Sequence, residues 1–198
     1  SMPDMGTIVL RLDIKETGGA NQAWTGQLNW LASDTDKYVS VTARFDGPFG
    51  ALTVPVNQPK AIAQYDAVLL FAGGIGVTAV HSITKFCAKY NANTHLTWVV
   101  RSPAYLNLLP GLVTMKEHVT TYVTRGGDPY RTDYVQGRPS WDKIVQRQTI
   151  LPDGSRCKNV AVVVCGPGSM VIDVLNACRD TELTFGTRFH IHMESFEM

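Results

Sequence analysis

The stretch AVLLFAGGIGVTAVHSITKFC, Ala67 to Cys87, passes from an apolar block through three glycines into a segment with helical apolar spacing. Ala67–Ala72 has the continuous apolar character of a strand that is buried on both faces of a sheet. Gly73, Gly74 and Gly76 follow at once, and glycine at a strand exit is typical where another group approaches the backbone closely. The stretch therefore predicts a buried strand, a tight turn and a helix.

The same alternation continues toward the end of the chain, which is typical of a parallel sheet with helices on both faces. The expected strands are Ala67–Ala72, Leu96–Arg101, Val119–Thr124, Val160–Cys165 and Phe189–Met193. The expected helices are Thr78–Tyr90, Leu106–Lys116, Trp141–Gln148 and Ser169–Ala177. Together they predict an α/β fold with a doubly wound, mostly parallel, five-stranded Rossmann-like sheet.

The first part of the chain has a different pattern. Residues 6–14 and 38–47 have strand composition with partial alternation, and Pro55 and Pro59 follow them. Two such strands before prolines resemble the closing part of a small β-domain. We therefore expect the end of one domain and a linker over residues 1–59, and a second, complete domain over residues 60–198.

The composition argues against several classes of function. The 198 residues carry 18 Lys and Arg against 17 Asp and Glu, a formal charge of +1, so no field that attracts nucleic acid is visible. The longest apolar runs are too short to cross a bilayer. The four cysteines are neither clustered nor at metal-ligand spacing, which predicts no metal site and fits a reducing compartment.

Parallel sheets bind ligands beyond the carboxyl ends of their strands, so the residues there form the candidate site. The first exit, Gly73–Gly76, and the fourth, Gly166–Gly168, are both glycine-rich. If the first strand lies beside the fourth, the two exits flank the central crevice of the sheet. A glycine turn before a helix offers N–H groups to phosphate oxygens, although the spacing is not G-x-G-x-x-G and a plain tight turn is the alternative.

Two side chains at the exits indicate the chemistry. Arg101 follows the second strand with no acidic residue beside it, a pattern that favours the 2′-phosphate of NADPH over the ribose hydroxyls of NADH. A solvated arginine is the alternative. Cys165 ends the fourth strand and is expected to face the crevice, with a small buried thiol as the alternative. No base and orienting group accompany this thiol, so a covalent nucleophile is not expected.

Seven short motifs follow one another along the chain: FDGPFG (45–50), LLFAGGIGVT (69–78), WVVRS (98–102), YVTRG (122–126), GRPSWDKI (137–144), VVCGPGSM (163–170) and HMESF (192–196). In this order they resemble the C-terminal NAD(P)H-binding dehydrogenase domain of the ferric reductase and NADPH oxidase family, a branch of the ferredoxin–NADP reductase superfamily. Ala79 departs from the family pattern, which has proline after the threonine of the glycine turn.

The resemblance implies a role for each candidate site residue. The residues that would hold the pyrophosphate and ribose of NADPH are Gly73, Gly74, Ile75, Gly76 and Thr78. Those that would hold the adenosine end and its phosphates are Arg101, Ser102 and Arg138. Cys165 and Gly166, with Pro167 next to them, would lie beside the nicotinamide, and Phe196 would cover the flavin ring. Cys165 and Phe196 are therefore the candidate catalytic residues.

The resemblance also implies a larger protein, in which residues 1–59 are the C-terminal remnant of a flavin-binding β-barrel domain with a linker, and residues 60–198 are the NAD(P)H-binding domain. The family's flavin-binding motif, histidine-proline followed by a hydroxyl residue, is absent because no proline follows any histidine of the chain. Heme-bearing membrane helices are absent as well. We therefore expect an excised part of a membrane protein, soluble by itself and derived from its cytosolic face. It would bind NADPH and FAD, would have the heme domain as its partner, and would be inactive without the full flavin domain.

Three functions remain open. The first is a transmembrane oxidoreductase in which hydride passes from NADPH to FAD and electrons then pass through hemes to ferric iron or dioxygen. The second is a soluble FAD-dependent NAD(P)H reductase of the same superfamily. The third is a nucleotide-binding module without catalysis. The resemblance argues against this third function, because it implies that Cys165, Gly166 and Phe196 contact the nicotinamide and the flavin.

Overall fold

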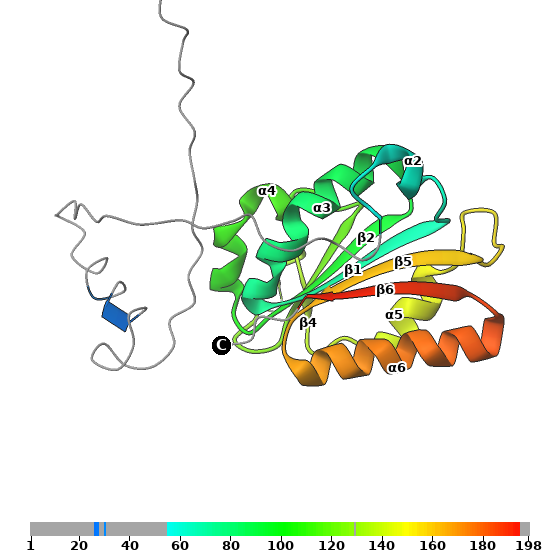
Figure 1. The fold of residues 1–198 in the computed structure, drawn as a ribbon. Helices are drawn as coiled ribbons and strands as arrows, with labels where there is room; N and C mark the ends of the chain where they lie inside the picture. Colours follow the sequence, from blue (N-terminus) through cyan, green and yellow to red (C-terminus); the bar gives the residue numbers. More distant parts are fainter. Residues whose placement is uncertain (1–25, 28–29, 31–54, 129, 195–198) are drawn as a thin grey trace, which may run out of the picture. The chain divides into compact units, whose positions relative to one another are not determined.

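The computed structural model describes residues 26–27, 30, 55–128 and 130–194 (Figure 1). The strands predicted over 6–14 and 38–47, most of the domain end predicted over 1–59, and Phe196 lie outside these described residues. Residues 55–194 contain a parallel sheet with helices on both faces. The α/β fold expected from the alternating pattern is therefore confirmed.

The sheet contains every strand that the sequence predicts over this region. Its strands are β1 (Ala67–Gly73), β2 (Thr94–Val100), β3 (Val119–Val123), β4 (Val135–Gln136), β5 (Asn159–Cys165) and β6 (Arg188–Glu194). Their order in this described sheet is β4-β3-β2-β1-β5-β6, and all pairs are parallel. β1 thus lies beside β5, the fourth predicted strand, as a central crevice requires. The additional strand, β4, is too short for a periodic pattern to reveal it.

The helices agree with the prediction except where proline intervenes. They are α2 (Pro59–Ile62), α3 (Val77–Tyr90), α4 (Pro110–Val113), α5 (Trp141–Gln148) and α6 (Gly168–Phe185), with 3-10 turns η1 (Gly74–Gly76) and η2 (Pro103–Leu108). The single helix predicted over Leu106–Lys116 is wrong, because Pro110 lacks an N–H and separates η2 from α4. α6 continues past Ala177 to Gly186, whose φ of 74° ends it.

Each face of the sheet has its own core. Figure 1 shows α2, α3 and α4 over one face and α5 and α6 over the other. Alternate residues of the central strands point to the two sides, so Leu70 and Val163 lie in the core beneath α3 while Leu69 and Val162 lie in the core beneath α6. Because β1 and β5 are buried on both sides, their apolar runs are continuous. The core beneath α3 also includes Val56, from the predicted linker.

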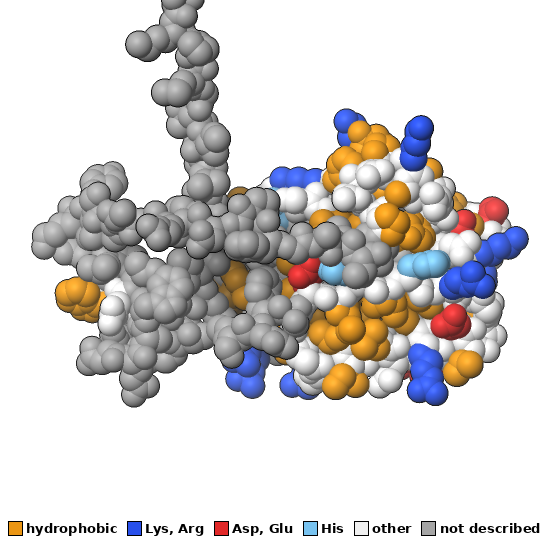
Figure 2. Space-filling model, in the orientation of Figure 1, with side chains coloured by type: hydrophobic (Ala, Val, Ile, Leu, Met, Phe, Trp, Pro, Cys, Tyr) orange, Lys and Arg blue, Asp and Glu red, His pale blue; other side chains and the backbone are white. Residues whose placement is uncertain are grey.

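The surface carries mixed charge. Figure 2 shows Lys, Arg, Asp and Glu side chains scattered among polar and apolar ones over the face that it displays. Exposed apolar side chains on α6 and β6 include Ile172, Leu183 and Met193. Among the helices of the described residues, none combines the length and hydropathy that a membrane crossing needs.

Candidate nucleotide-binding site

The exits of β1 and β5 pack directly against each other. The two strands are adjacent and in register up to their carboxyl ends. A Cβ atom on Gly73 would lie 2.5 Å from Pro167 Cδ, and one on Gly76 would lie 2.5 Å from the carbonyl oxygen of Cys165. Real Cβ atoms essentially never approach another atom more closely than 3.0 Å, so both positions require glycine. The group that approaches the backbone is therefore the second glycine-rich loop at Gly73 and the last residue of β5 at Gly76.

Gly74 is glycine for a different reason. Its φ of 56° lies in the left-handed region, which side chains with a Cβ rarely adopt. A Cβ atom built on Gly74 would meet no atom within 4 Å. Of the three glycines in the turn, Gly74 is thus the one with open space beside its backbone, and this open side is where a phosphate has room to approach.

Hydrogen bonds hold the carbonyl groups of the glycine turn. The Gly74 carbonyl accepts the Val77 N–H and also the indole N–H of Trp98, whose Nε1 lies 2.9 Å from the oxygen. Thr78 Oγ1 donates to the Ile75 carbonyl at 2.9 Å, so this predicted ribose contact also closes the turn. η1 runs directly into α3, so the first N–H groups of η1 are the ones without a partner within this helical segment, and they lie at the positive end of the helix dipole. Such an arrangement binds anions.

Arginine side chains occupy the next two strand exits. Arg101 follows β2, Arg125 follows β3, and both side chains are exposed. The Arg125 N–H donates to the Arg101 carbonyl at 2.8 Å, which anchors the two residues side by side. Arg125 is a further candidate site residue, which the sequence analysis missed because its proximity to Arg101 follows from the pairing of β2 with β3. Its place in the YVTRG motif is the signal that the sequence offers. Two guanidinium groups suit a phosphate dianion.

Ser102 and Arg138 lie at the same edge of the sheet. Ser102 Oγ accepts the Ala104 N–H at 3.3 Å and so caps η2. The Gly137 N–H donates to the Val123 carbonyl at 2.9 Å, and Gly137 has a φ of 108°. This bond holds the chain beside the exit of β3, and the exposed Arg138 follows it. Arg138 is thus anchored near the exit that carries Arg125.

The Cys165 thiol faces the core and not the crevice, contrary to the expectation from its place at the strand end. Its side chain is 0% exposed and belongs to the core beneath α3. A Cβ on Gly76 would lie 3.1 Å from the sulfur, so the thiol is covered by the glycine turn. Burial, with a smaller contribution from Glu194, raises the Cys165 pKa to about 11. The thiol is therefore protonated at neutral pH, and the alternative of a small buried thiol is the correct one.

The loop after Cys165 contributes the accessible part of the crevice. Gly166 is half-buried, Pro167 is exposed, and Glu194 at the end of β6 pairs in register with Cys165. Glu194 Oε1 lies 2.8 Å from His192 Nε2. Backbone groups of the two glycine-rich loops and the Glu194 carboxyl group therefore meet at this end of the site, whereas the arginines lie at the other end.

These residues fit a nicotinamide dinucleotide. The open backbone at Gly74 lies between the two exposed arginines that follow β2 and β3 and the narrow contact between the ends of β1 and β5. The predicted contact with FAD, Phe196, lies outside the described residues. Among the described residues, no cluster of three or more His, Cys, Asp or Glu side chains is placed to hold a metal ion.

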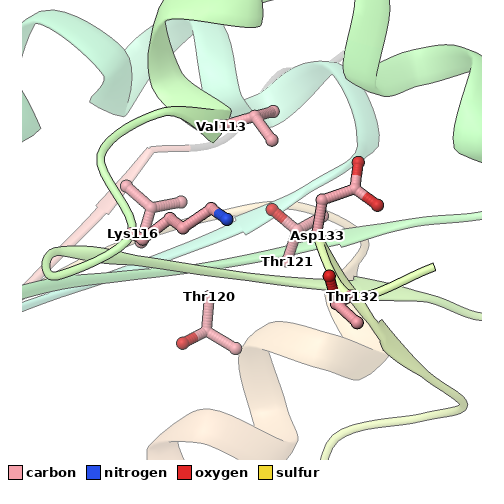
Figure 3. A pocket seen from close by; sticks show the side chains of 7 residues that line it. Val113, Lys116, Thr120, Thr121, Thr132 and Asp133 are labelled. Atoms are coloured by element: carbon pink, nitrogen blue, oxygen red, sulfur yellow. The ribbon is translucent and has the colours of Figure 1, made fainter.

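A separate hollow lies away from this site. It has a volume of about 180 Å³ and is lined by Val113, Lys116, Val119, Thr120, Thr121, Thr132 and Asp133 (Figure 3). These residues come from α4, the turn between α4 and β3, the first three residues of β3 and the loop before β4, so the hollow is not at the strand exits. It is smaller than typical ligand pockets of roughly 300–1,000 Å³. We therefore place the candidate site at the carboxyl edge of the sheet.

Known proteins resemble this chain in the same region. Residues 65–128 match the family model of the ferric reductase NAD binding domain. A heavy chain of the superoxide-generating NADPH oxidase of Dictyostelium discoideum is 26% identical over 221 residues, which cover 87% of this chain and 41% of that protein. The toluene-4-sulfonate monooxygenase system reductase TsaB1 of Comamonas testosteroni is 30% identical over 117 residues, which cover 58% of this chain and 31% of that protein.

The fold is similar to that of a solved reductase. The crystal structure of Amycolatopsis cytochrome P450 reductase GcoB matches with a TM-score of 0.54 and 24% identity, over 76% of this chain and 42% of that one. The chain spans less than half the length of each of the two curated relatives. The segment matched by the family model runs from before β1 to beyond β3, and so includes the glycine turn, Arg101 and Arg125. Residues 65–128 therefore match the NAD binding domain of ferric reductases, and the chain is similar over most of its length to an NADPH oxidase heavy chain.

Proposed function

We propose that this chain is the NADPH-binding part of a flavin-dependent transmembrane oxidoreductase and lies on the cytosolic face of the membrane. In the proposed reaction, hydride passes from NADPH to FAD, and the electrons then pass through hemes to ferric iron or dioxygen. The observation that carries the proposal is the contact between the two glycine-rich exits, which leaves the backbone open at Gly74 beside an arginine pair.

Each part of the site has a proposed role toward NADPH. The turn Gly73–Gly76, with Thr78, binds the pyrophosphate and the adjacent ribose. Arg101, Arg125 and Arg138, with Ser102, bind the adenosine end and its phosphates. Gly166 and Pro167 lie beside the nicotinamide, where Cys165 supports the glycine turn from beneath through its buried side chain. Phe196 covers the flavin ring, a role that stays a prediction from the family resemblance.

A preference for NADPH over NADH follows from the charges at the β2 exit. Residues 101–109 contain no Asp or Glu that would accept ribose hydroxyls. A hydrogen bond between a guanidinium and a phosphate contributes about 1.5–3 kcal/mol, or about 10–150-fold in affinity.

Calorimetric titration of the chain with NADPH and NADH tests this proposal. We expect tighter binding of NADPH, and we expect Arg101→Ala to remove most of the difference. Arg179→Ala is the matched control, because Arg179 is exposed on α6, away from the strand exits, and its loss changes the net charge equally. Equal dissociation constants for the two nucleotides, or a preference that survives in Arg101→Ala, would contradict the proposal.

The second candidate function is a soluble FAD-dependent NAD(P)H reductase, and the similarity to TsaB1 favours it. The two functions differ in the sequence that adjoins this domain in the complete protein. Apolar stretches of about 20 residues with paired histidines are typical of a membrane heme protein. A third function, nucleotide binding without catalysis, predicts that the complete protein binds NADPH and never oxidises it.

A further inference from the structure

Trp98 joins the buried core to the glycine turn. The side chain lies in β2 and is 0% exposed, in the core beneath α3. A buried tryptophan needs a hydrogen-bond partner for its indole N–H. Here the partner is the Gly74 carbonyl, 2.9 Å from Nε1. The core thus contacts the phosphate-binding turn through one directed bond.

This bond determines which way a peptide group of the turn faces. The Gly74 carbonyl points inward, where it accepts both the Trp98 indole N–H and the Val77 N–H. In a planar trans peptide the carbonyl and the N–H point in opposite directions. The Ile75 N–H shares its peptide plane with the Gly74 carbonyl, so it points away from Trp98.

We propose that Trp98 is a positioning residue of the nucleotide site, which holds the Gly74–Ile75 peptide so that the Ile75 N–H meets the pyrophosphate. The inference rests on the proposed function, because it assigns this turn to the pyrophosphate. Glycine at position 74 has wide conformational freedom, so without the indole bond the Val77 N–H alone holds this peptide and it rotates more easily. A rotated peptide presents its carbonyl oxygen to the phosphate, which repels it.

The test compares Trp98→Phe with a matched control, Thr187→Val. Phenylalanine keeps an aromatic ring in the core and removes the indole N–H. Thr187 is also 0% exposed, and its Oγ1 donates to the Cys157 carbonyl at 2.9 Å. It precedes β6, at the amino edge of the sheet, opposite the strand exits. Each variant therefore loses one buried bond from a side chain to a backbone carbonyl, but only Trp98→Phe loses it at the turn.

Two ligands separate positioning from general destabilisation. NADP⁺ contains the pyrophosphate, whereas adenosine 2′-monophosphate carries the 2′-phosphate alone. We expect both variants to unfold at lower urea concentration than the wild type. We expect Trp98→Phe to weaken NADP⁺ binding about 5–10-fold, the loss of one hydrogen bond, and to leave adenosine 2′-monophosphate binding unchanged. Thr187→Val leaves the binding of both ligands unchanged.

Each outcome decides between the inference and the proposed function. A Trp98→Phe protein that binds NADP⁺ as tightly as the wild type overturns the inference alone, as does an equal loss for both ligands. A wild-type chain that binds neither NADP⁺ nor NADPH overturns the proposed function. If Trp98→Phe does not fold, 3-benzothienylalanine at position 98 keeps the size of the ring system and lacks the N–H, and the same binding comparison applies to it.

Discussion

Replacing Gly76 with alanine tests whether contact between the two glycine-rich loops is what requires glycine at this position. The backbone of Gly76 is helical, with φ −57° and ψ −15°, so alanine adopts it without strain. The added Cβ, however, would lie 2.5 Å from the Cys165 oxygen and 2.9 Å from the Cys165 carbonyl carbon. Both atoms belong to the backbone at the end of a central strand, which cannot move away as a flexible side chain can.

The magnitude follows from two opposing effects. Overpacking in a well-packed interior costs about 1–3 kcal/mol, and we take the upper half of that range because the contact is with backbone. The lower backbone entropy of alanine in the unfolded chain returns about 0.4–1 kcal/mol. We therefore expect the free energy of unfolding to fall by about 2 kcal/mol, a large fraction of the stability of a typical domain.

Urea unfolding followed by far-UV circular dichroism measures this change. With a slope of about 2 kcal/mol per molar urea, the midpoint moves down by about 1 M. Gly111→Ala is the control, because Gly111 is exposed in α4, has no positive φ, and a Cβ there would meet no atom within 4 Å. This control should be neutral or slightly stabilising. A Gly76→Ala protein as stable as the wild type, with Gly111→Ala unchanged too, would refute the reasoning from the loop contact.

Three further predictions concern the charges and the cofactors. Arg125→Ala should weaken NADPH binding about 10-fold, because one charge-assisted hydrogen bond is lost, and should leave NADH binding unchanged. Calorimetry measures both affinities, and equal losses for the two nucleotides would contradict the role of Arg125 at the 2′-phosphate. Burial, with smaller effects of His118 and Arg147, lowers the His95 pKa to about 4. The unfolded chain therefore takes up this proton first, so the contribution of His95 to stability is complete above about pH 6.5 and is lost as the pH falls toward 4. The titration of His95 should make the wild type about 2–3 kcal/mol less stable at pH 4.5 than at pH 7.5. His95→Asn should reduce this difference in the free energy of unfolding, measured by urea titration at the two pH values, and an unchanged difference would show that other groups cause it. Finally, the chain lacks the histidine-proline motif, so after incubation with excess FAD and desalting it should bind NADPH but show no flavin absorbance and no NADPH-dependent ferricyanide reduction. Stoichiometric retained flavin with steady turnover would show that its flavin site lies elsewhere.

Local patterns in the sequence were sufficient for five of the six strands of the described sheet. The central strand Asn159–Cys165 was predicted to within one residue because burial on both faces leaves a continuous apolar run. Helix α5 was predicted with its correct bounds, Trp141–Gln148. The break between η2 and α4 was also encoded locally, in Pro110, but the prediction gave more weight to the apolar pattern around it. The two-residue strand β4 has no local pattern and depends on its pairing with β3.

The sequence by itself determined that the strand exits carry glycine, arginine and cysteine, and that the glycine turn resembles those of nucleotide-binding domains. Only the tertiary structure decided what each residue contacts. Pro167 and the Cys165 carbonyl, not a ligand, make glycine necessary at Gly73 and Gly76. Arg125 joins Arg101, and Trp98 reaches the glycine turn, only because β2 lies between β1 and β3. The physical reason is that composition and periodicity report the burial and backbone conformation of one segment, whereas contacts between segments depend on the order in which the strands pair.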